Sequence, residues 1–217
     1  FAADKAVAAG LPTQPTPKPA TGRRVAVIGS GPAGLSAAYY LALEGHQVTL
    51  LEGEKQAGGT LRFGIPAYRL PDDVLDREIE DILSLGVELK TNMWLGRDYQ
   101  IESLRAEGYD AVFLSIGAMA GKRAGIPGEK TRGVMPAIEF LRRVHWGDRV
   151  DLGKRVIVVG GGFTAADAAR TAMREGATEV VMMYRRTQNE MTAAPHEIHE
   201  CQVEGVTFDF LAAPVEV

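Results

Sequence analysis

The hydrophobic positions of the chain follow the same order twice. A short apolar run that reads as a buried strand is followed by a glycine-rich turn, an apolar helix and a second strand. This βαβ order predicts an α/β fold with two Rossmann-like nucleotide-binding domains, each built on a parallel sheet. The predicted segments are VAVIG at 25–29, a helix over about 33–44, QVTLLE at 47–52, RVIVVG at 155–160, a helix that ends near 175 and EVVMMYRR at 179–186.

The remaining segments predict less regular structure. Residues 1–9 have a helix-forming composition, 10–22 form a proline-rich tether, and 55–71 are rich in glycine and proline and predict a loop. We therefore divide the chain into the N-terminal helix and tether (1–22), a first domain (23–150) and a second domain (151–217). Further helices are expected over 72–86, 135–146 and 194–205, and further strands at 87–91, at 109–118 and within 206–217.

Composition and charge exclude several classes of protein. The formal net charge of −4 provides no basic field for nucleic acid, and no apolar run approaches the ~20 residues of a membrane span. Because the first residues also lack the pattern of a signal peptide, we expect a cytoplasmic protein. The single cysteine, Cys201, excludes an internal disulfide, a redox cysteine pair and a four-thiolate iron–sulfur site within these residues. We expect Cys201 to be an inert helix residue. The histidines of HEIHE, His196 and His199, are three positions apart rather than four, so we expect a solvated helix face and no metal site.

The first glycine turn, GSGPAG, has the G-x-G-x-x-G pattern of a dinucleotide site. The first glycine permits a sharp bend, the second lets a pyrophosphate approach the backbone, and the third lets helix and strand pack closely. An acid ends the following strand, where its carboxylate accepts hydrogen bonds from ribose hydroxyls. The motif alone does not decide between FAD and NAD. The residues expected at this site are Gly29, Gly31, Pro32, Ala33, Gly34 and Glu52.

Three longer runs, GSGPAGL, LLEGEKQAGGTLRFGIPAYRLP and YDAVFLSIGA, resemble the flavin half of the glutamate synthase small-subunit (beta) family. That family also includes the N-terminal flavoprotein region of dihydropyrimidine dehydrogenase. The resemblance covers nearly the whole chain, and its specific parts are GIPAYRLP and the spacing of the acid to the following GG. It implies that the first turn binds FAD. It also implies that Gly59 and Thr60 lie along the FAD, Arg69 reaches its phosphates or ring, Leu95 touches the adenine side, and Ile116 and Gly117 form a second backbone contact. For Arg69 a surface salt bridge is the alternative.

The second glycine turn, GGGFTA, has alanine in place of the third glycine, as many NADP sites do. The strand after it ends in two arginines rather than an acid. Two guanidiniums suit a 2′-phosphate, which favours NADPH over NADH, and a solvated strand end is the alternative. The family resemblance agrees through GGGFTAADAARTA and YRRTQNEM, with Asp167 matching the family's acid, although Thr192 stands where some members carry a further arginine. The expected site residues are Gly160, Gly162, Phe163, Thr164, Ala165, Arg185 and Arg186.

Two dinucleotide sites predict two cofactors, with a hydride moving from the nicotinamide to the flavin. No catalytic acid or base is required for that step, and none is assigned. The resemblance implies that electrons then pass to iron–sulfur clusters or a partner subunit. The alternatives are a non-catalytic flavin-binding electron-transfer or scaffold module and a flavin monooxygenase, for which the sequence shows no motif. Disulfide reductases, which also pair FAD with NADPH, require a redox cysteine pair that this chain lacks.

The resemblance also predicts that the chain is part of a larger polypeptide. In relatives, a cysteine-rich helical domain that holds iron–sulfur clusters precedes the segment at 1–9, so we place the clusters in missing regions or in a partner. In relatives the FAD domain resumes after the NADP module, whereas this chain stops within the module at LAAPVEV. We therefore expect the FAD domain to be incomplete at its C-terminal end.

Overall fold

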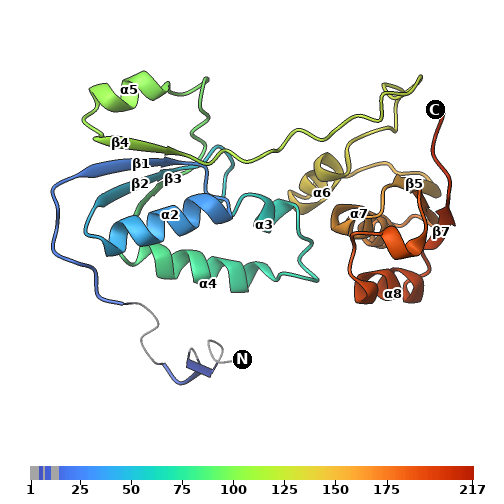
Figure 1. Cartoon of the computed structure of the whole chain (residues 1–217), viewed down its shortest axis with the longest axis horizontal. Helices are drawn as coiled ribbons and strands as arrows, with labels where there is room; N and C mark the ends of the chain where they lie inside the picture. The colour runs from blue at the N-terminus through green and yellow to red at the C-terminus, as the bar shows by residue number, and fades with distance from the viewer. Residues whose placement is uncertain (1–4, 7, 11–14) are drawn as a thin grey trace. The chain divides into compact units, whose positions relative to one another are not determined.

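The computed structural model describes residues 5–6, 8–10 and 15–217. Most of the predicted N-terminal helix and part of the tether lie outside these residues. The described chain packs into two compact units. Figure 1 colours the chain by residue number, from blue at the N-terminus to red at the C-terminus. The first unit comprises the chain up to Arg62 and Leu70–Gly117, and the second comprises Phe63–Arg69 and Ala118–Val217.

The first unit is built on a four-stranded parallel sheet in the order β3-β2-β1-β4. Its predicted strands and long helices are present. Two short helices, α3 and α5, were not predicted; α3 lies where the sequence indicated only loop. The elements are β1 (Arg24–Ile28), α2 (Pro32–Leu43), β2 (Gln47–Leu51), α3 (Thr60–Phe63), α4 (Asp72–Leu83), β3 (Glu88–Lys90), α5 (Ile101–Ala106) and β4 (Ala111–Leu114).

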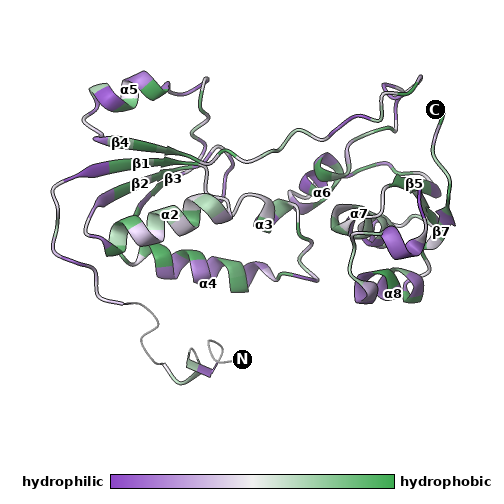
Figure 2. Ribbon diagram, in the orientation of Figure 1, coloured by the Kyte–Doolittle hydropathy of each residue, from purple (hydrophilic) through white to green (hydrophobic). Residues whose placement is uncertain are grey.

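Helices cover both faces of this sheet. On one face α2 and α4 bury Leu35, Ala38 and Leu75 against the strands, and on the other face α5 buries Leu104. Figure 2 shows how the hydropathy of the residues matches this burial. The central strands are largely hydrophobic, whereas α4 carries a hydrophilic face as well as a hydrophobic one. The six-residue α5 forms because a capping box between Gln100 and Ser103 and the burial of Leu104 fix it in place, and neither gives a strong periodic signal.

The second unit is built on a three-stranded parallel sheet in the order β5-β6-β7. The segment 206–217, predicted to form one or two strands, forms one. The elements are α6 (Ala137–His145), β5 (Arg155–Val159), α7 (Phe163–Arg174), β6 (Glu179–Tyr184), the 3-10 turn η1 (Gln188–Glu190), α8 (Pro195–Val203) and β7 (Thr207–Phe210).

The core of this second unit lies between its sheet and the helices α6, α7 and α8. Phe140 and Leu141 of α6, the alanines of α7 and Cys201 of α8 are all part of it. Because α6 packs against α7, the boundary between the two packed units lies after Gly117. The sequence had placed the domain boundary after residue 150. Cys201 is fully buried, and this burial raises the pKa of its thiol to about 11, consistent with the inert role expected for it. Among the described residues, no helix combines the length and apolar character that crossing a bilayer requires.

Candidate functional site: two dinucleotide cradles

The first glycine turn joins β1 to α2 through a very close backbone contact. A Cβ atom on Gly34 would lie 1.7 Å from the carbonyl oxygen of Gly29, so no side chain fits between helix and turn. Gly29 itself has a φ of +95°, and a Cβ there would lie 2.4 Å from the carbonyl oxygen of Ser115. At Gly31, by contrast, a Cβ would meet nothing within 4 Å. The turn is thus closed where the protein packs and open where a pyrophosphate would approach.

The helix that follows this turn begins with an uncapped N-terminus. Gly31 is its N-cap residue, and no side chain accepts a hydrogen bond from the first backbone N–H groups. Free N–H groups and the positive end of the helix dipole make such a terminus a favourable place for phosphate oxygens. The geometry therefore fits the pyrophosphate of a dinucleotide.

Glu52 fixes the shape of this turn from the end of β2. It is buried, and one carboxylate oxygen accepts hydrogen bonds from the backbone N–H (2.9 Å) and the hydroxyl of Ser30. The other oxygen accepts a hydrogen bond from the backbone N–H of Glu54 at 2.8 Å. Each carboxylate oxygen has two lone pairs, so these three hydrogen bonds leave one lone pair, on the oxygen that accepts from Glu54, for the predicted contact with ribose hydroxyls.

A second glycine pair lies against the turn. Gly58 donates its N–H to the hydroxyl of Ser30 at 3.1 Å, and a Cβ on Gly59 would lie 2.7 Å from Cα of Gly31. The Cα of Ile116 also lies close to Gly29, 3.2 Å from the position of a Cβ there. We call this assembly, formed by 29–34, Glu52, Gly58–Gly59 and Ile116, the first cradle.

The structure thus brings together most of the residues that the sequence predicted for the FAD site. Thr60 begins α3 directly after Gly59, and Gly117, with a φ of +70°, follows Ile116. Leu95 is partly buried and forms a bridge with Tyr99. Whether these residues contact FAD stays a prediction.

Sequence reasoning missed two polar residues of this region, Ser30 and Tyr99. Ser30 occupies a variable position of the glycine motif, and Tyr99 gave no signal at all. The buried hydroxyl of Tyr99 has no hydrogen-bond partner among the described residues. Burial, together with the nearby charge of Glu52, raises the pKa of Tyr99 to about 12, so this hydroxyl is an unused donor near the carboxylate that was expected to bind ribose.

The second glycine turn joins β5 to α7 in the second unit. Gly162 is the N-cap of α7, again with no side-chain cap, and Phe163 at the first helical position is half exposed. A Cβ on Gly160 would lie 3.2 Å from that of Ala165, so alanine is accommodated at the third position. This turn also fits a pyrophosphate at an open helix N-terminus.

The loop after β6 folds back onto this turn. The ring of Tyr184 lies over Gly161, where a Cβ would come within 2.8 Å of it, and the N–H groups of Thr192 and Ala193 donate to the carbonyl oxygen of Gly161 at 3.0 and 3.1 Å. A capping box between Thr187 and Glu190 closes the loop between these two points. We call the turn 160–165 together with the loop 184–193 the second cradle.

The two arginines predicted to bind a 2′-phosphate lie just past the end of β6, in this loop. Both are exposed. Arg185 makes no hydrogen bond or ion pair within the part of the chain that the structure describes, and Arg186 has only a 3.9 Å ion pair with Glu190. Thr192 lies beside Gly162, with its hydroxyl oxygen 3.1 Å from the position of a Cβ there. The two guanidiniums are therefore available to an anion, and their role stays a prediction.

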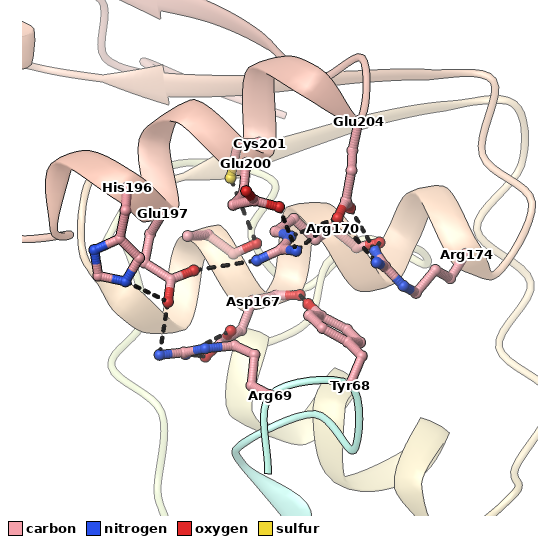
Figure 3. A network of polar contacts seen from close by, with 11 residues as sticks. Tyr68, Arg69, Asp167, Arg170, Arg174, His196, Glu197, Glu200, Cys201 and Glu204 are labelled. Atoms are coloured by element: carbon pink, nitrogen blue, oxygen red, sulfur yellow. Dashed lines mark hydrogen bonds and ion pairs between the residues drawn. The ribbon is translucent and has the colours of Figure 1, made fainter. Parts of the chain in front are cut away.

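Arg69, predicted to reach FAD, has its guanidinium in the second unit. Its Nη1 lies 2.8 Å from both carboxylate oxygens of Asp167, and its Nη2 lies 2.9 Å from Glu197 (Figure 3). The salt bridge that the sequence left as the alternative is thus formed, although to buried carboxylates rather than at the surface. Contact with FAD stays a prediction for Arg69.

A network of arginines and carboxylates extends from this pair along α7 and α8. Arg170 donates to Glu197 at 3.2 Å and to Glu204 at 2.6 Å, and Arg174 also donates to Glu204. The ring of Tyr68 lies beneath both guanidiniums, with centroid distances of 4.8 Å to Arg170 and 3.9 Å to Arg174. The sequence gave no indication of this network, because its members are distributed over three segments.

The histidines near this network lie on an exposed part of α8. No group of potential metal ligands gathers anywhere in the described residues. His196 is 74% exposed and lies 3.4 Å from Glu197, and His199 is also exposed. The prediction of a solvated helix face is confirmed.

Comparison with known proteins agrees with this geometry. A family model described as pyridine nucleotide-disulphide oxidoreductase matches residues 23–217. The chain belongs to this family. The predicted resemblance to glutamate synthase small chains is confirmed by its relatives.

Three relatives show how far the similarity of this oxidoreductase extends. It is 44% identical over 93% of its length to the NADPH-Fe(3+) oxidoreductase subunit beta of Geobacter sulfurreducens and 47% identical over 89% to the NADP(+)-dependent formate dehydrogenase subunit beta of Moorella thermoacetica. It is 38% identical over 91% to the glutamate synthase [NADPH] small chain of Escherichia coli. The chain spans 30%, 28% and 44% of these proteins, respectively.

Solved structures confirm the predicted fold class of this oxidoreductase. FprA of Mycobacterium tuberculosis in complex with NADPH aligns with a TM-score of 0.74 at 21% identity, over 92% of this chain and 61% of that one. Thioredoxin reductase of Lactococcus lactis aligns with a TM-score of 0.66 at 23% identity, over 90% and 66%. The shared architecture is an α/β fold with two parallel sheets.

The first prediction separates packing from ligand binding in the first glycine turn. Gly34→Ala forces a Cβ onto a backbone oxygen, so it should lower the free energy of unfolding by about 1–3 kcal/mol. Gly31→Ala meets open space and should cost less than about 1 kcal/mol. Urea unfolding followed by circular dichroism measures both. Equal free energies of unfolding for the two variants would show that the close contact between residues 34 and 29 does not require glycine.

The second prediction concerns the pH dependence of Glu204. Hydrogen bonds from Arg174 and Arg170 lower its pKa from 4.5 to about 2 in the folded chain. A lowered folded-state pKa contributes stability above the unfolded pKa, and this contribution is lost as the pH falls from about 4.5 towards 2. The stability difference between wild type and Glu204→Gln should therefore be largest near neutral pH and shrink in acid.

Urea unfolding at a series of pH values tests this, with Glu200→Gln as the matched control on the same helix. Glu200 is half exposed, and its ion pair with Arg170 is long, at 3.5 Å. Its removal should therefore change the free energy of unfolding little at any pH. A Glu204→Gln difference that is independent of pH would contradict the assignment.

Proposed function

We propose that this chain is a FAD-dependent oxidoreductase module that takes a hydride from NADPH and passes the electrons to iron–sulfur clusters or a partner subunit. The observation that carries the proposal is the pair of dinucleotide cradles within one chain, of which only the second is followed by arginines. At the ribose position the first cradle carries a negative side chain and the second carries positive ones. This difference suits two different dinucleotides, one with a free ribose and one with a 2′-phosphate.

In the first cradle the proposed ligand is FAD. The backbone N–H groups at the start of α2 would hold the pyrophosphate, and Glu52 would accept hydrogen bonds from the adenosine ribose. Its carboxylate is held in place by Ser30 and by the N–H of Glu54, so its orientation is set before any ligand arrives. We propose that Gly59, Thr60 and the backbone at Ile116–Gly117 line the same ligand; the contact of Gly59 with Gly31 and of Ile116 with Gly29 supports this.

In the second cradle the proposed ligand is NADPH. The start of α7 would hold its pyrophosphate, and Arg185 and Arg186 would pair with the 2′-phosphate. NADH has no such phosphate and would leave both guanidiniums without their partner. The contacts of the loop that carries them with the glycine turn, at Tyr184 and Thr192, support this proposal.

The chemistry of the proposed reaction resides in the cofactors: bound nicotinamide supplies a hydride and bound flavin accepts it. The chain's residues bind and orient the two dinucleotides, and no side chain is assigned a proton transfer. Downstream partners are proposed from relatives whose names describe them as subunits or small chains of oxidoreductases. The iron–sulfur acceptor is supported by the family resemblance of GIPAYRLP and its neighbouring runs.

The third prediction tests the proposed electron transfer directly. Anaerobic addition of NADPH to the FAD-loaded chain should bleach the visible absorption band of oxidised flavin. Bound flavin that stays oxidised would contradict hydride transfer by this chain and favour the alternative of a non-catalytic flavin-binding scaffold. Gly31→Ala provides a control, since a methyl group in the open part of the turn should reduce FAD retention without unfolding the chain.

The fourth prediction tests coenzyme choice. Replacing both Arg185 and Arg186 by alanine removes two charge-assisted contacts and should lower the ratio of NADPH to NADH affinity by about a hundredfold. Arg155→Ala, which removes an exposed arginine from β5 of the same unit, should leave the ratio unchanged. Separate titrations with NADPH and NADH measure the ratio, and an unchanged ratio in the double variant would refute the role of the two arginines.

A further inference from the structure

The segment Phe63–Arg69, here called the docking segment, packs with the second unit although the chain on both sides of it belongs to the first. Two adjacent side chains hold it there. Arg69 pairs with Asp167 on α7 and Glu197 on α8, and Tyr68 lies under Arg170 and Arg174. Figure 3 shows both side chains directed from this segment towards the two helices.

The first attachment, through Arg69, neutralises the charge of two buried carboxylates. Asp167 and Glu197 are 4% and 6% exposed, whereas the arginine that neutralises them is 25% exposed. Glu197 retains Arg170 as a second partner at 3.2 Å, and His196 lies 3.4 Å from it at the surface. Among the described contacts, Asp167 has no other cationic partner within 4 Å. When Arg69 leaves, Asp167 therefore loses its ion-pair partner, and less of the buried negative charge beside α7 is compensated.

The second attachment is an aromatic contact that Glu204 organises. Its carboxylate accepts hydrogen bonds from both Arg170 and Arg174, and this fixes the two guanidiniums over the ring of Tyr68. The centroid distances of 4.8 and 3.9 Å are within the range of cation–π attraction. The docking segment is thus held by charge at one residue and by an aromatic ring at the next.

The charged attachment lies close to the second cradle along the same helix. Asp167 follows the N-cap Gly162 by five positions, which is about 7 Å along an α-helix. An uncompensated carboxylate at that distance opposes the positive helix terminus and repels an incoming anion. With Arg69 docked, that repulsion is cancelled. A dinucleotide with a pyrophosphate and a 2′-phosphate therefore binds more favourably when the segment is docked.

We propose that docking of the segment Phe63–Arg69 onto α7 and α8, and binding of NADPH or NADP+ at the second cradle, favour one another. Arg69 is in this respect a positioning residue that acts through Asp167 and Glu197. The coupling is reciprocal by thermodynamic necessity: docking strengthens nucleotide binding and the nucleotide stabilises docking to the same extent. This inference rests on the proposed function of the second cradle.

The fifth prediction tests the coupling with charge removal and its reversal. Arg69→Gln should weaken NADP+ binding to the 217-residue chain by about tenfold, measured by isothermal titration calorimetry. Adding Asp167→Asn and Glu197→Gln to that variant removes the uncompensated charges and should restore most of the lost affinity. The control Arg155→Gln breaks an exposed ion pair with Glu179 in the same unit and should leave the affinity unchanged.

The restored variant distinguishes coupling from direct contact. If Arg69 itself touched the nucleotide, removing the two carboxylates would not restore binding, and that outcome would overturn the inference. An Arg69→Gln affinity equal to that of the wild type would also overturn it. A wild-type chain that binds no NADP+ would instead refute the proposed function of the second cradle, and the inference would fall with it.

Hydrogen exchange on the wild-type chain gives a second readout that needs no variant. The backbone N–H of Arg69 donates to the carbonyl oxygen of Pro66 at 2.8 Å within the docking segment. Saturating NADP+ should slow exchange of amides in this segment by about tenfold, because the nucleotide favours the docked state. NADP+ that binds without slowing exchange there would overturn the coupling while leaving the proposed function intact.

Discussion

The contact between helix and turn at Gly34 and Gly29 is the constraint on which the first cradle depends. With 1.7 Å between a Cβ on Gly34 and the carbonyl oxygen of Gly29, only glycine allows α2 to begin where it does. That placement aims the uncapped N-terminus of α2 at the space beside Gly31. In the second cradle the helix and the turn are less closely packed, since an alanine, Ala165, fits beside Gly160. The absence of a methyl group therefore determines where the helix and its uncapped backbone N–H groups begin.

Buried carboxylates then organise the polar residues around each turn, and they do so with different partners. In the first unit Glu52 is held by two N–H groups and one hydroxyl of neighbouring residues, which leaves one carboxylate lone pair for a ligand. In the second unit Asp167, Glu197 and Glu204 are held by arginines. Burial raises the pKa of Asp167, and the hydrogen bond and charge of Arg69 oppose that rise.

Much of the fold and part of the site could be predicted from sequence, for identifiable reasons. After an initial arginine, the strands β1 and β5 are short apolar runs, and each is followed by the glycine pattern of a strand-to-helix turn. The helices α3 and α5 escaped prediction because they are too short to show a period. A capping box and the burial of Leu104 stabilise α5, and α3 buries Phe63. Tyr99 likewise gave no signal, since its place near Glu52 arises only when its strand-to-helix connection folds against the sheet.

The sequence by itself determined the two nucleotide-binding units and the glycines at their turns. It also determined the acid that follows the first turn and the arginines that follow the second. These features are local, so backbone sterics and residue chemistry suffice to read them. Only the tertiary structure decided the partners of Arg69 and the place of the segment around it. A motif such as GIPAYRLP states which side chains are present, but which carboxylates neutralise its arginine depends on helices about a hundred residues further along the chain, which only folding brings to it.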